Sequence, residues 1–193
     1  FEVLSAVVAQ AEINAASGND LLDHIGMPLE LVADGGADEV GPVRIEPFLH
    51  HQVDMAEIEE DSTALEPSAG QGGISDHLPK ERTTCVEIEA LNAEILEDKG
   101  FTVVRGDFLE FKGEFDRIVM NPPFSDNRAA DHVSHAFSCL KKNGVLVACL
   151  PASLKGKTLI SGEKHEWSET LEDCFDGTSV RVVVLKIKKL SNR

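Results

Sequence analysis

The stretch that decides the fold is residues 116–124, with the sequence DRIVMNPPF. Its first half is a short apolar run, which predicts a buried strand. Two consecutive prolines cannot continue a central strand, because neither has an N–H to donate to the neighbouring strand. The strand therefore stops there and leaves Asn121 and Phe124 at its carboxyl end. In open α/β sheets this is the edge at which ligands bind.

Strand-like and helix-like segments alternate on both sides of this stretch. The predicted strands cover residues 62–66, 83–88, 101–105, 145–150 and 180–186. The predicted helices cover residues 46–58, 89–99, 128–142 and 163–174, and the glycine-rich segment 67–75 is expected to open another. This alternation predicts an α/β fold with a doubly wound, mostly parallel sheet and helices on both faces. We expect this domain to span residues 46–193 and to follow an acidic, partly helical extension over residues 1–45.

The acidic residues are concentrated in the first half of the chain. The formal net charge is −16, and residues 1–80 contain 16 acidic side chains but only Arg44 and Lys80 as basic ones. Such a surface repels phosphate backbones, which argues against a nucleic-acid substrate. The excess of acidic residues is also explained by a role in solubility or by adaptation of the surface to salt.

Several classes of protein are disfavoured by composition. We find no apolar run of membrane-spanning length and no signal-peptide pattern, so we expect a cytoplasmic protein that does not contact a membrane. The four cysteines are far apart and form no CxxC pair, which indicates reduced thiols and no zinc site. His50 and His51 are adjacent on a predicted helix and point to different sides, so we predict no metal site there either.

Three features at the predicted strand ends fit an adenosine-containing cofactor. Gly70 and Gly72 form a G-x-G turn after the first strand, where backbone can approach a ligand closely. Glu87 ends the next strand, where a carboxylate can accept hydrogen bonds from both hydroxyls of a ribose. Asp107 ends the third strand and can accept a hydrogen bond from an adenine amino group, while Phe108 or Ile88 packs on the ring. Both NAD and S-adenosylmethionine satisfy these features.

The sequence resembles a known family in four segments. LEPSAGQGG (65–73), CVEIEALNAEIL (85–96), VRGDFLEF (104–111) and DRIVMNPPF (116–124) look like motifs I to IV of the class I S-adenosylmethionine-dependent methyltransferases. The NPPF tetrad resembles that of the amino-methyltransferases, especially the DNA N6-adenine enzymes. The resemblance covers roughly residues 46–193 and implies a Rossmann-like methyltransferase domain that uses S-adenosylmethionine.

The resemblance also implies roles for individual residues. The methionine part of the cofactor would be lined by Glu66, Ala69, Gly70 and Gly72. Glu87 would hold the ribose, and Asp107 and Phe108, with Ile88, would hold the adenine. The catalytic turn would consist of Asn121, Pro122, Pro123 and Phe124, with Asn121 also beside the cofactor.

The tetrad suits methyl transfer to an aromatic amine. Such an amine is a poor nucleophile, because its lone pair is delocalised into the ring. The side-chain oxygen of Asn121 and the carbonyl of Pro122 offer two acceptors that favour a pyramidal nitrogen, and the prolines fix the backbone. Phe124 offers a face on which an unpaired or flipped base can stack.

The chain also departs from the family pattern. The nearest match to the family's Thr-Pro segment is Glu46-Pro47, without the threonine. Residues 151–177 leave little room for a complete sixth strand, and no separate target-recognition domain fits. The cationic residues expected near the mouth of the site are few, namely Arg128, Lys155, Lys157 and Lys164, with Lys186, Lys188 and Lys189 at the end of the chain.

Four functions therefore stay open. We favour methylation of N6 of adenine in DNA, with a protein partner as a candidate source of target recognition. The second is methylation of RNA or of a protein glutamine. The third is a degenerate methyltransferase-like subunit that binds a partner. The fourth, an NAD-dependent oxidoreductase, is disfavoured by Ser75 at the third glycine position and by the tetrad.

Overall fold

The computed structural model describes residues 45–124, 128–172 and 180–190. The extension predicted over residues 1–45 lies outside the described residues, apart from its last residue. Within the described part, none of the helices has the length and apolar character needed to cross a membrane.

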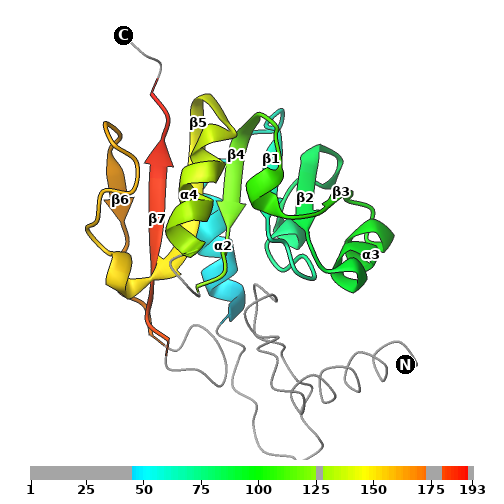
Figure 1. The fold of residues 1–193 in the computed structure, drawn as a ribbon, viewed down its shortest axis with the longest axis horizontal. Helices are drawn as coiled ribbons and strands as arrows, with labels where there is room; N and C mark the ends of the chain where they lie inside the picture. The colour runs from blue at the N-terminus through cyan, green and yellow to red at the C-terminus, as the bar shows by residue number, and fades with distance from the viewer. Residues whose placement is uncertain (1–44, 125–127, 173–179, 191–193) are drawn as a thin grey trace, which may run out of the picture.

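A seven-stranded sheet forms the centre of the domain, with the strand order β3-β2-β1-β4-β5-β7-β6 (Figure 1). β1 to β5 pair in parallel with one another, and β7 runs antiparallel between β5 and β6. The strands are β1 (Ala64–Pro67), β2 (Thr83–Glu87), β3 (Thr102–Arg105), β4 (Phe115–Met120), β5 (Leu140–Pro151), β6 (His165–Trp167) and β7 (Val182–Lys188). The sequence-based prediction of a mostly parallel α/β sheet is confirmed.

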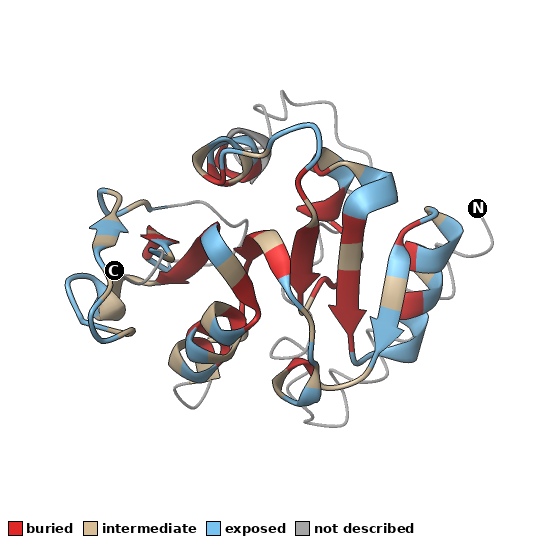
Figure 2. Cartoon of the chain, turned by 90° about the horizontal axis from the view of Figure 1, so that it is seen from above, coloured by how far each residue is buried: buried red, intermediate tan, exposed pale blue. Residues whose placement is uncertain are grey.

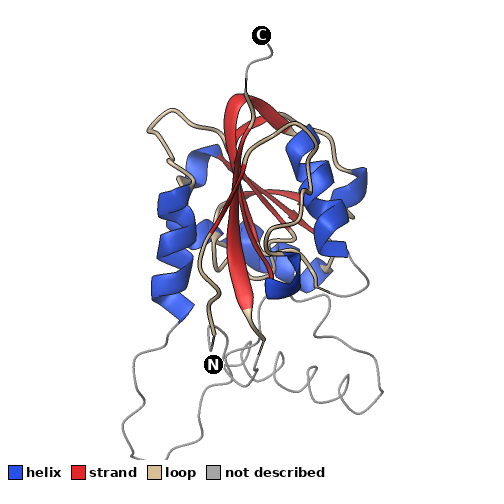
Figure 3. Ribbon diagram, turned by 90° about the vertical axis from the view of Figure 1, so that its left-hand side faces the viewer, coloured by secondary structure: helices blue, strands red, loops and turns tan. Residues whose placement is uncertain are grey.

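Helices cover both faces of this sheet (Figure 3). The three α-helices of the described part are α2 (Ile45–Met55), α3 (Ala90–Asp98) and α4 (Arg128–Ser138). Neighbouring strand residues point to opposite faces, so the apolar β4 and β5 strands supply two separate cores. On one face Val133 and Ala136 of α4 pack with Ile118 and Met120, and on the other Phe48 of α2 packs in the cluster that contains Val119.

Burial decreases from the centre of the sheet to its edges (Figure 2). All four residues of β1 are buried, whereas β3 at the edge has three exposed residues. Parallel strands covered on both faces are expected to be continuously apolar, which explains why the central strands were recognisable from sequence.

The C-terminal part differs from the sequence-based prediction. The predicted helix over residues 163–174 is wrong in its described part: His165–Trp167 forms β6, which pairs antiparallel with β7, and Leu171 makes an isolated bridge to Val182. β6 has only three residues, in line with the expectation that residues 151–177 leave little room for a complete sixth strand. The backbone N–H and C=O groups on the side of β7 that faces away from β5 pair with residues 165–167. That edge exists only once the sheet has formed, so no local sequence pattern predicts it.

Two predicted helices are shorter than expected. The turn after β1 is followed only by the 3-10 helices η2 (Ser75–His77) and η3 (Lys80–Arg82), with no α-helix before β2. The helix predicted over residues 128–142 ends at Ser138, because Leu140 already pairs with Phe115 as the first residue of β5. The remaining predicted strands and helices are found with small shifts of their ends.

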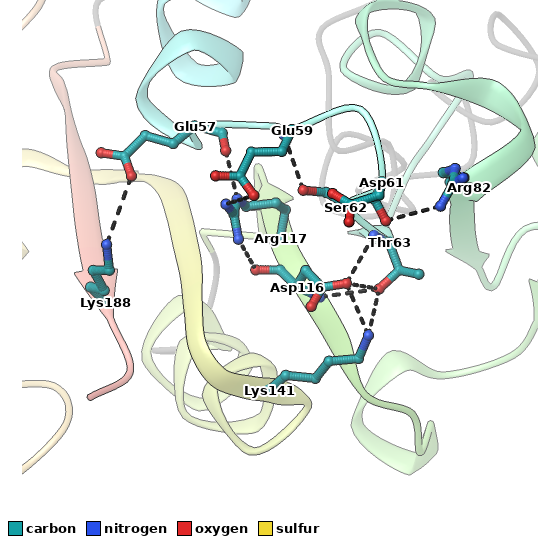
Figure 4. A network of polar contacts seen from close by, with 10 residues as sticks. All are labelled: Glu57, Glu59, Asp61, Ser62, Thr63, Arg82, Asp116, Arg117, Lys141 and Lys188. Atoms are coloured by element: carbon teal, nitrogen blue, oxygen red, sulfur yellow. Dashed lines mark hydrogen bonds and ion pairs between the residues drawn. The ribbon is translucent and has the colours of Figure 1, made fainter. Parts of the chain in front are cut away.

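A polar network holds the amino-terminal ends of β1, β4 and β5 together (Figure 4). Asp116 Oδ2 accepts hydrogen bonds from the backbone N–H of Thr63 at 3.0 Å and from Lys141 Nζ at 2.9 Å. Arg117 donates to the carbonyl of Glu57 at 2.8 Å and so ties β4 to the end of α2. This network lies at the edge opposite to the NPPF turn, so we assign it to stability.

Candidate functional site

A pocket opens at the carboxyl ends of the parallel strands. Its lining comes from the turns after β1, β2, β3 and β4 and from the first half of α4. The lining residues are Ser68, Val86, Glu87, Ile88, Gly106, Asp107, Phe108, Pro123, Arg128 and His132. The glycine turn and the NPPF turn thus meet at one edge of the sheet, as parallel strands with right-handed crossovers require.

Glu87 is fixed in this pocket by backbone donors. Its Oε2 accepts a hydrogen bond from the N–H of Gly70 at 2.6 Å, and its Oε1 accepts one from the N–H of Glu89 at 2.8 Å. Burial raises the pKa of Glu87, and the backbone donors partly oppose that shift. A carboxylate oxygen can accept more than one hydrogen bond, so each oxygen keeps capacity for a ligand hydroxyl.

The glycine turn supports the pocket from behind. Gly70 and Gly72 adopt left-handed backbone angles, with φ of 56° and 89°. Neither glycine lines the pocket. Ser68 is the residue of this turn that lines the pocket with Glu87, and it also has a positive φ, of 58°. Ala69 is buried and donates its N–H to the carbonyl of Val86, which joins the turn to β2.

Glu66 is buried beneath the turn rather than in the pocket lining. Its carboxyl accepts a hydrogen bond from the hydroxyl of Ser75, which also lies 3.0 Å from Cys85 Sγ. Burial raises the pKa of Glu66 to about 8, in spite of the hydrogen bonds from Ser75 and Ile74. Glu66 is therefore a largely neutral acid near pH 7.

The residues predicted to hold adenine all reach the pocket, with different exposure. Ile88 is exposed and Phe108 is buried in the core. Asp107 caps the following 3-10 helix: its Oδ1 accepts a hydrogen bond from the N–H of Leu109 at 2.8 Å. This capping orients the side chain and occupies only one of its two oxygens.

Arg128 and His132 line the pocket from α4, and His132 was not singled out from the sequence. The His132 ring packs at 5.5 Å from the Phe108 ring, and burial lowers the pKa of His132 to about 4. It is therefore neutral near pH 7, and its Nδ1 has no hydrogen-bond partner among the described residues. His132 follows Ala129 by three residues, so both lie on the same, apolar face of the helix. A histidine on such a face is the sequence signal that could have identified His132.

The NPPF turn spans the edge between the two faces of the sheet. Pro123 lines the pocket on the α4 face, while Phe124 packs against the apolar cluster on the α2 face. Asn121 and Pro122 are buried. Asn121 Oδ1 accepts a hydrogen bond from Gln52 Nε2 of α2 at 2.9 Å, a contact that the sequence analysis did not foresee.

The site combines three chemical features. The pocket has a fixed buried carboxylate for hydroxyl groups and flat apolar surface from Phe108 and Pro123, and the buried carboxamides of Gln52 and Asn121 lie outside its lining, at the proline-stiffened turn. Within the described residues, no three side chains of the metal-ligating types lie together. The polar and apolar groups of the pocket can hydrogen-bond to the hydroxyl and amine groups of a ligand and pack against a flat ring.

Comparison with known proteins relates this architecture to solved structures. No protein-family model matches the sequence, and no curated protein sequence matches it. TrmN from Thermus thermophilus superposes with a TM-score of 0.62 at 19% identity, over 75% of this chain and 49% of that one. A dimethyladenosine transferase from Plasmodium falciparum gives 0.61 at 16% identity, over 74% and 61% of the two chains.

A third structure is matched over most of its length. It is a candidate RNA methyltransferase from Pyrococcus horikoshii, with a TM-score of 0.58 at 21% identity, over 75% of this chain and 82% of that one. The present chain spans less than two thirds of the first two structures. At these identities the likeness concerns the fold, and the chain has the Rossmann-like fold found in these methyltransferase structures.

Proposed function

We propose that this protein transfers a methyl group from S-adenosylmethionine to an exocyclic amine, with N6 of adenine in nucleic acid as the acceptor. The observation that carries the proposal is the pocket in which Glu87 and Asp107 lie together with Pro123 of the NPPF turn. Two carboxylates from adjacent strand ends and a stiff turn from a third thus share one concave surface.

The residues of the pocket fit the cofactor. Glu87 would accept hydrogen bonds from the ribose hydroxyls, because its position is fixed by Gly70 and Glu89 while both oxygens keep free lone pairs. The free oxygen of Asp107 would accept from the adenine amine, with Phe108 against the ring. When bound, S-adenosylmethionine supplies an electrophilic methyl group on a positively charged sulfur.

The NPPF turn would hold the acceptor amine. Asn121 and the carbonyl of Pro122 would accept hydrogen bonds from the amine and orient its lone pair, while the pocket excludes water from the methyl group. Positioning of this kind supplies much of the rate in a transfer that needs no covalent enzyme intermediate. Phe124 would provide the stacking face for the base.

Two observations bear on which polymer carries the acceptor amine. The resemblance of the tetrad favours DNA, whereas two of the matched structures are a dimethyladenosine transferase and a candidate RNA methyltransferase. We therefore place RNA first and DNA second as substrates. A shared fold alone does not carry a substrate from one protein to another.

The test is transfer of a labelled methyl group from S-adenosylmethionine to separate pools of RNA, DNA and protein. We expect label in nucleic acid as N6-methyladenine, and loss of at least about 100-fold in Asn121→Ala, since an oriented acceptor contributes on that order. Transfer that survives Asn121→Ala would refute the assignment of the turn.

A binding assay separates the cofactor from the reaction. Glu87→Gln should lower the affinity for S-adenosylmethionine by about tenfold or more, because it loses a charged acceptor. The matched control is Glu89→Gln, an exposed acid two residues on that does not line the pocket. A melting temperature raised by NAD and not by S-adenosylmethionine would favour the oxidoreductase instead.

A further inference from the structure

Two carboxamides form a closed pair at the NPPF turn. Gln52 of α2 is fully buried, and Asn121 is 5% exposed. They are 69 residues apart in sequence, and Gln52 Nε2 donates to Asn121 Oδ1 over 2.9 Å. Among the residues that the structure describes, no group accepts from Asn121 Nδ2 or donates to Gln52 Oε1.

The unused groups do not depend on how the amides are oriented. The oxygen and nitrogen of a carboxamide are assigned from the hydrogen-bond network, so both amides can be turned over together. One hydrogen bond then still joins Gln52 and Asn121, and one C=O and one NH₂ group still lack partners. The pair therefore keeps one unused acceptor on one residue and one unused donor on the other in either case.

Such a pair is costly in an apolar environment. Gln52 lies on the same helical face as Phe48 and Ala56, which are both buried in the apolar cluster on this side of the sheet. An apolar residue at this position would satisfy the helix pattern, whereas a buried amide with an unused group destabilises the fold. Polar groups that violate the local pattern in this way concentrate at functional sites.

We propose that Gln52 is a substrate-recognition residue, and that the Gln52–Asn121 pair binds the edge of adenine on which an amine stands beside a ring nitrogen. The amine donates to the free C=O of the pair, and the ring nitrogen accepts from the free NH₂ group. In this pair the acceptor and the donor come from two carboxamides, not from one, and guanine would present a carbonyl in place of the amine. Phe124, which is half-buried against the same cluster, would provide a stacking face for the entering ring.

This inference rests on the proposed function and assigns Gln52 a role within it. It predicts which substrate atoms matter. The experiment uses RNA and DNA oligonucleotides that contain adenosine, 1-deazaadenosine or 7-deazaadenosine at the methylated position. Each analogue keeps the amine and removes one ring nitrogen.

Methyl transfer is measured for the wild type, Gln52→Leu and the control His51→Leu, which changes an exposed residue of the same helix. With adenosine, Gln52→Leu should lower kcat/KM by about 10- to 100-fold, as expected for an unmatched buried contact. His51→Leu should stay within about twofold of the wild type, as surface changes usually do. One of the two analogues should lower the rate of methyl transfer by the wild type by about tenfold. The same analogue should cause no additional loss in Gln52→Leu.

The outcomes separate the two proposals. If the wild type methylates no pool, the proposed function fails and this inference fails with it. If the wild type is active but both deaza analogues slow wild type and Gln52→Leu by equal factors, only the inference is overturned. Should Gln52→Leu not fold, Gln52→Glu serves instead: it preserves shape and an acceptor, lacks the free donor, and must show the same insensitivity to the analogue.

Discussion

Gly72 gives a sharp test of how the glycine turn is built. Its φ is +89°, and a Cβ atom added there would lie 2.8 Å from Cδ2 of Leu96 on α3. A left-handed backbone costs an L-residue about 1–2 kcal/mol. Overpacking against a fully buried leucine adds about 1–3 kcal/mol. We therefore expect Gly72→Ala to lower the free energy of unfolding by roughly 2–5 kcal/mol.

Gly100 provides a matched control, because its φ is also +89° while the nearest atom to an added Cβ is Lys80 Cδ at 3.6 Å. Gly100→Ala should therefore show only the backbone cost of about 1–2 kcal/mol. Both variants are measured by urea unfolding, followed by circular dichroism at a fixed pH. In a Leu96→Ala background, Gly72→Ala should cost no more than Gly100→Ala does.

Two results would refute this reasoning. Equal destabilisation by Gly72→Ala and Gly100→Ala would mean that Leu96 gives way freely. A Gly72→Ala protein of normal stability that no longer binds S-adenosylmethionine would mean that Gly72 contacts the cofactor, as the sequence resemblance implies, and not chiefly α3.

The remaining predictions concern charge and the amide pair. Burial keeps Glu66 protonated in the folded state up to a pKa of about 8, while the unfolded chain loses that proton above its ordinary value of 4.5. The free energy of unfolding of the wild type should therefore fall as pH rises across this window. The stability of Glu66→Gln relative to the wild type, measured by thermal or urea unfolding, should rise by roughly 3–4 kcal/mol from pH 5 to pH 8. A stability difference that does not change with pH would contradict this prediction. For Asp116, burial alone would raise the pKa, but hydrogen bonds from Thr63 and Lys141 outweigh it and lower the pKa to about 2. The stability that ionised Asp116 contributes is present above its unfolded pKa of 3.8 and is lost as pH falls toward 2. Asp116→Asn should therefore lower the free energy of unfolding by about 1 kcal/mol at pH 7, after allowing for solvent screening, and by almost nothing at pH 2. The double replacement Gln52→Leu with Asn121→Leu removes two unused buried polar groups, so the free energy of unfolding should stay unchanged or rise by about 1–2 kcal/mol. Methyl transfer should be abolished in this variant. A large loss of stability would mean that the pair serves the fold.

The central strands were predictable because their chemistry is local. Residues 118–120 are apolar and are followed by Asn121 and two prolines, and β4 ends at Met120 as this pattern requires. Glu87 was placed correctly at the end of a strand for the same reason, since TTCVE is a buried run with a charged residue at its end. Strands that are buried on both faces identify themselves by composition alone.

The C-terminal edge was not predictable in this way. His165–Trp167 has three residues and no apolar alternation, and it becomes a strand only because β7 offers an unpaired edge. Likewise, the network of Thr63, Asp116 and Lys141 joins residues up to 78 apart in sequence, and no local pattern announces it.

The sequence by itself determined the strand that ends in NPPF, the glycine turn and the carboxylate of Glu87, because each depends on residues that are neighbours in the chain. Only the tertiary structure decided that Pro123 lines the pocket with Glu87 while Asn121 faces Gln52 on the other face of the sheet. The physical reason is that alternation carries Asn121 to the same face as Val119, toward α2, whereas Pro123 lies in the turn beyond β4, where alternation no longer holds, and the partners on the two faces come from α2 and α4, which are distant in sequence.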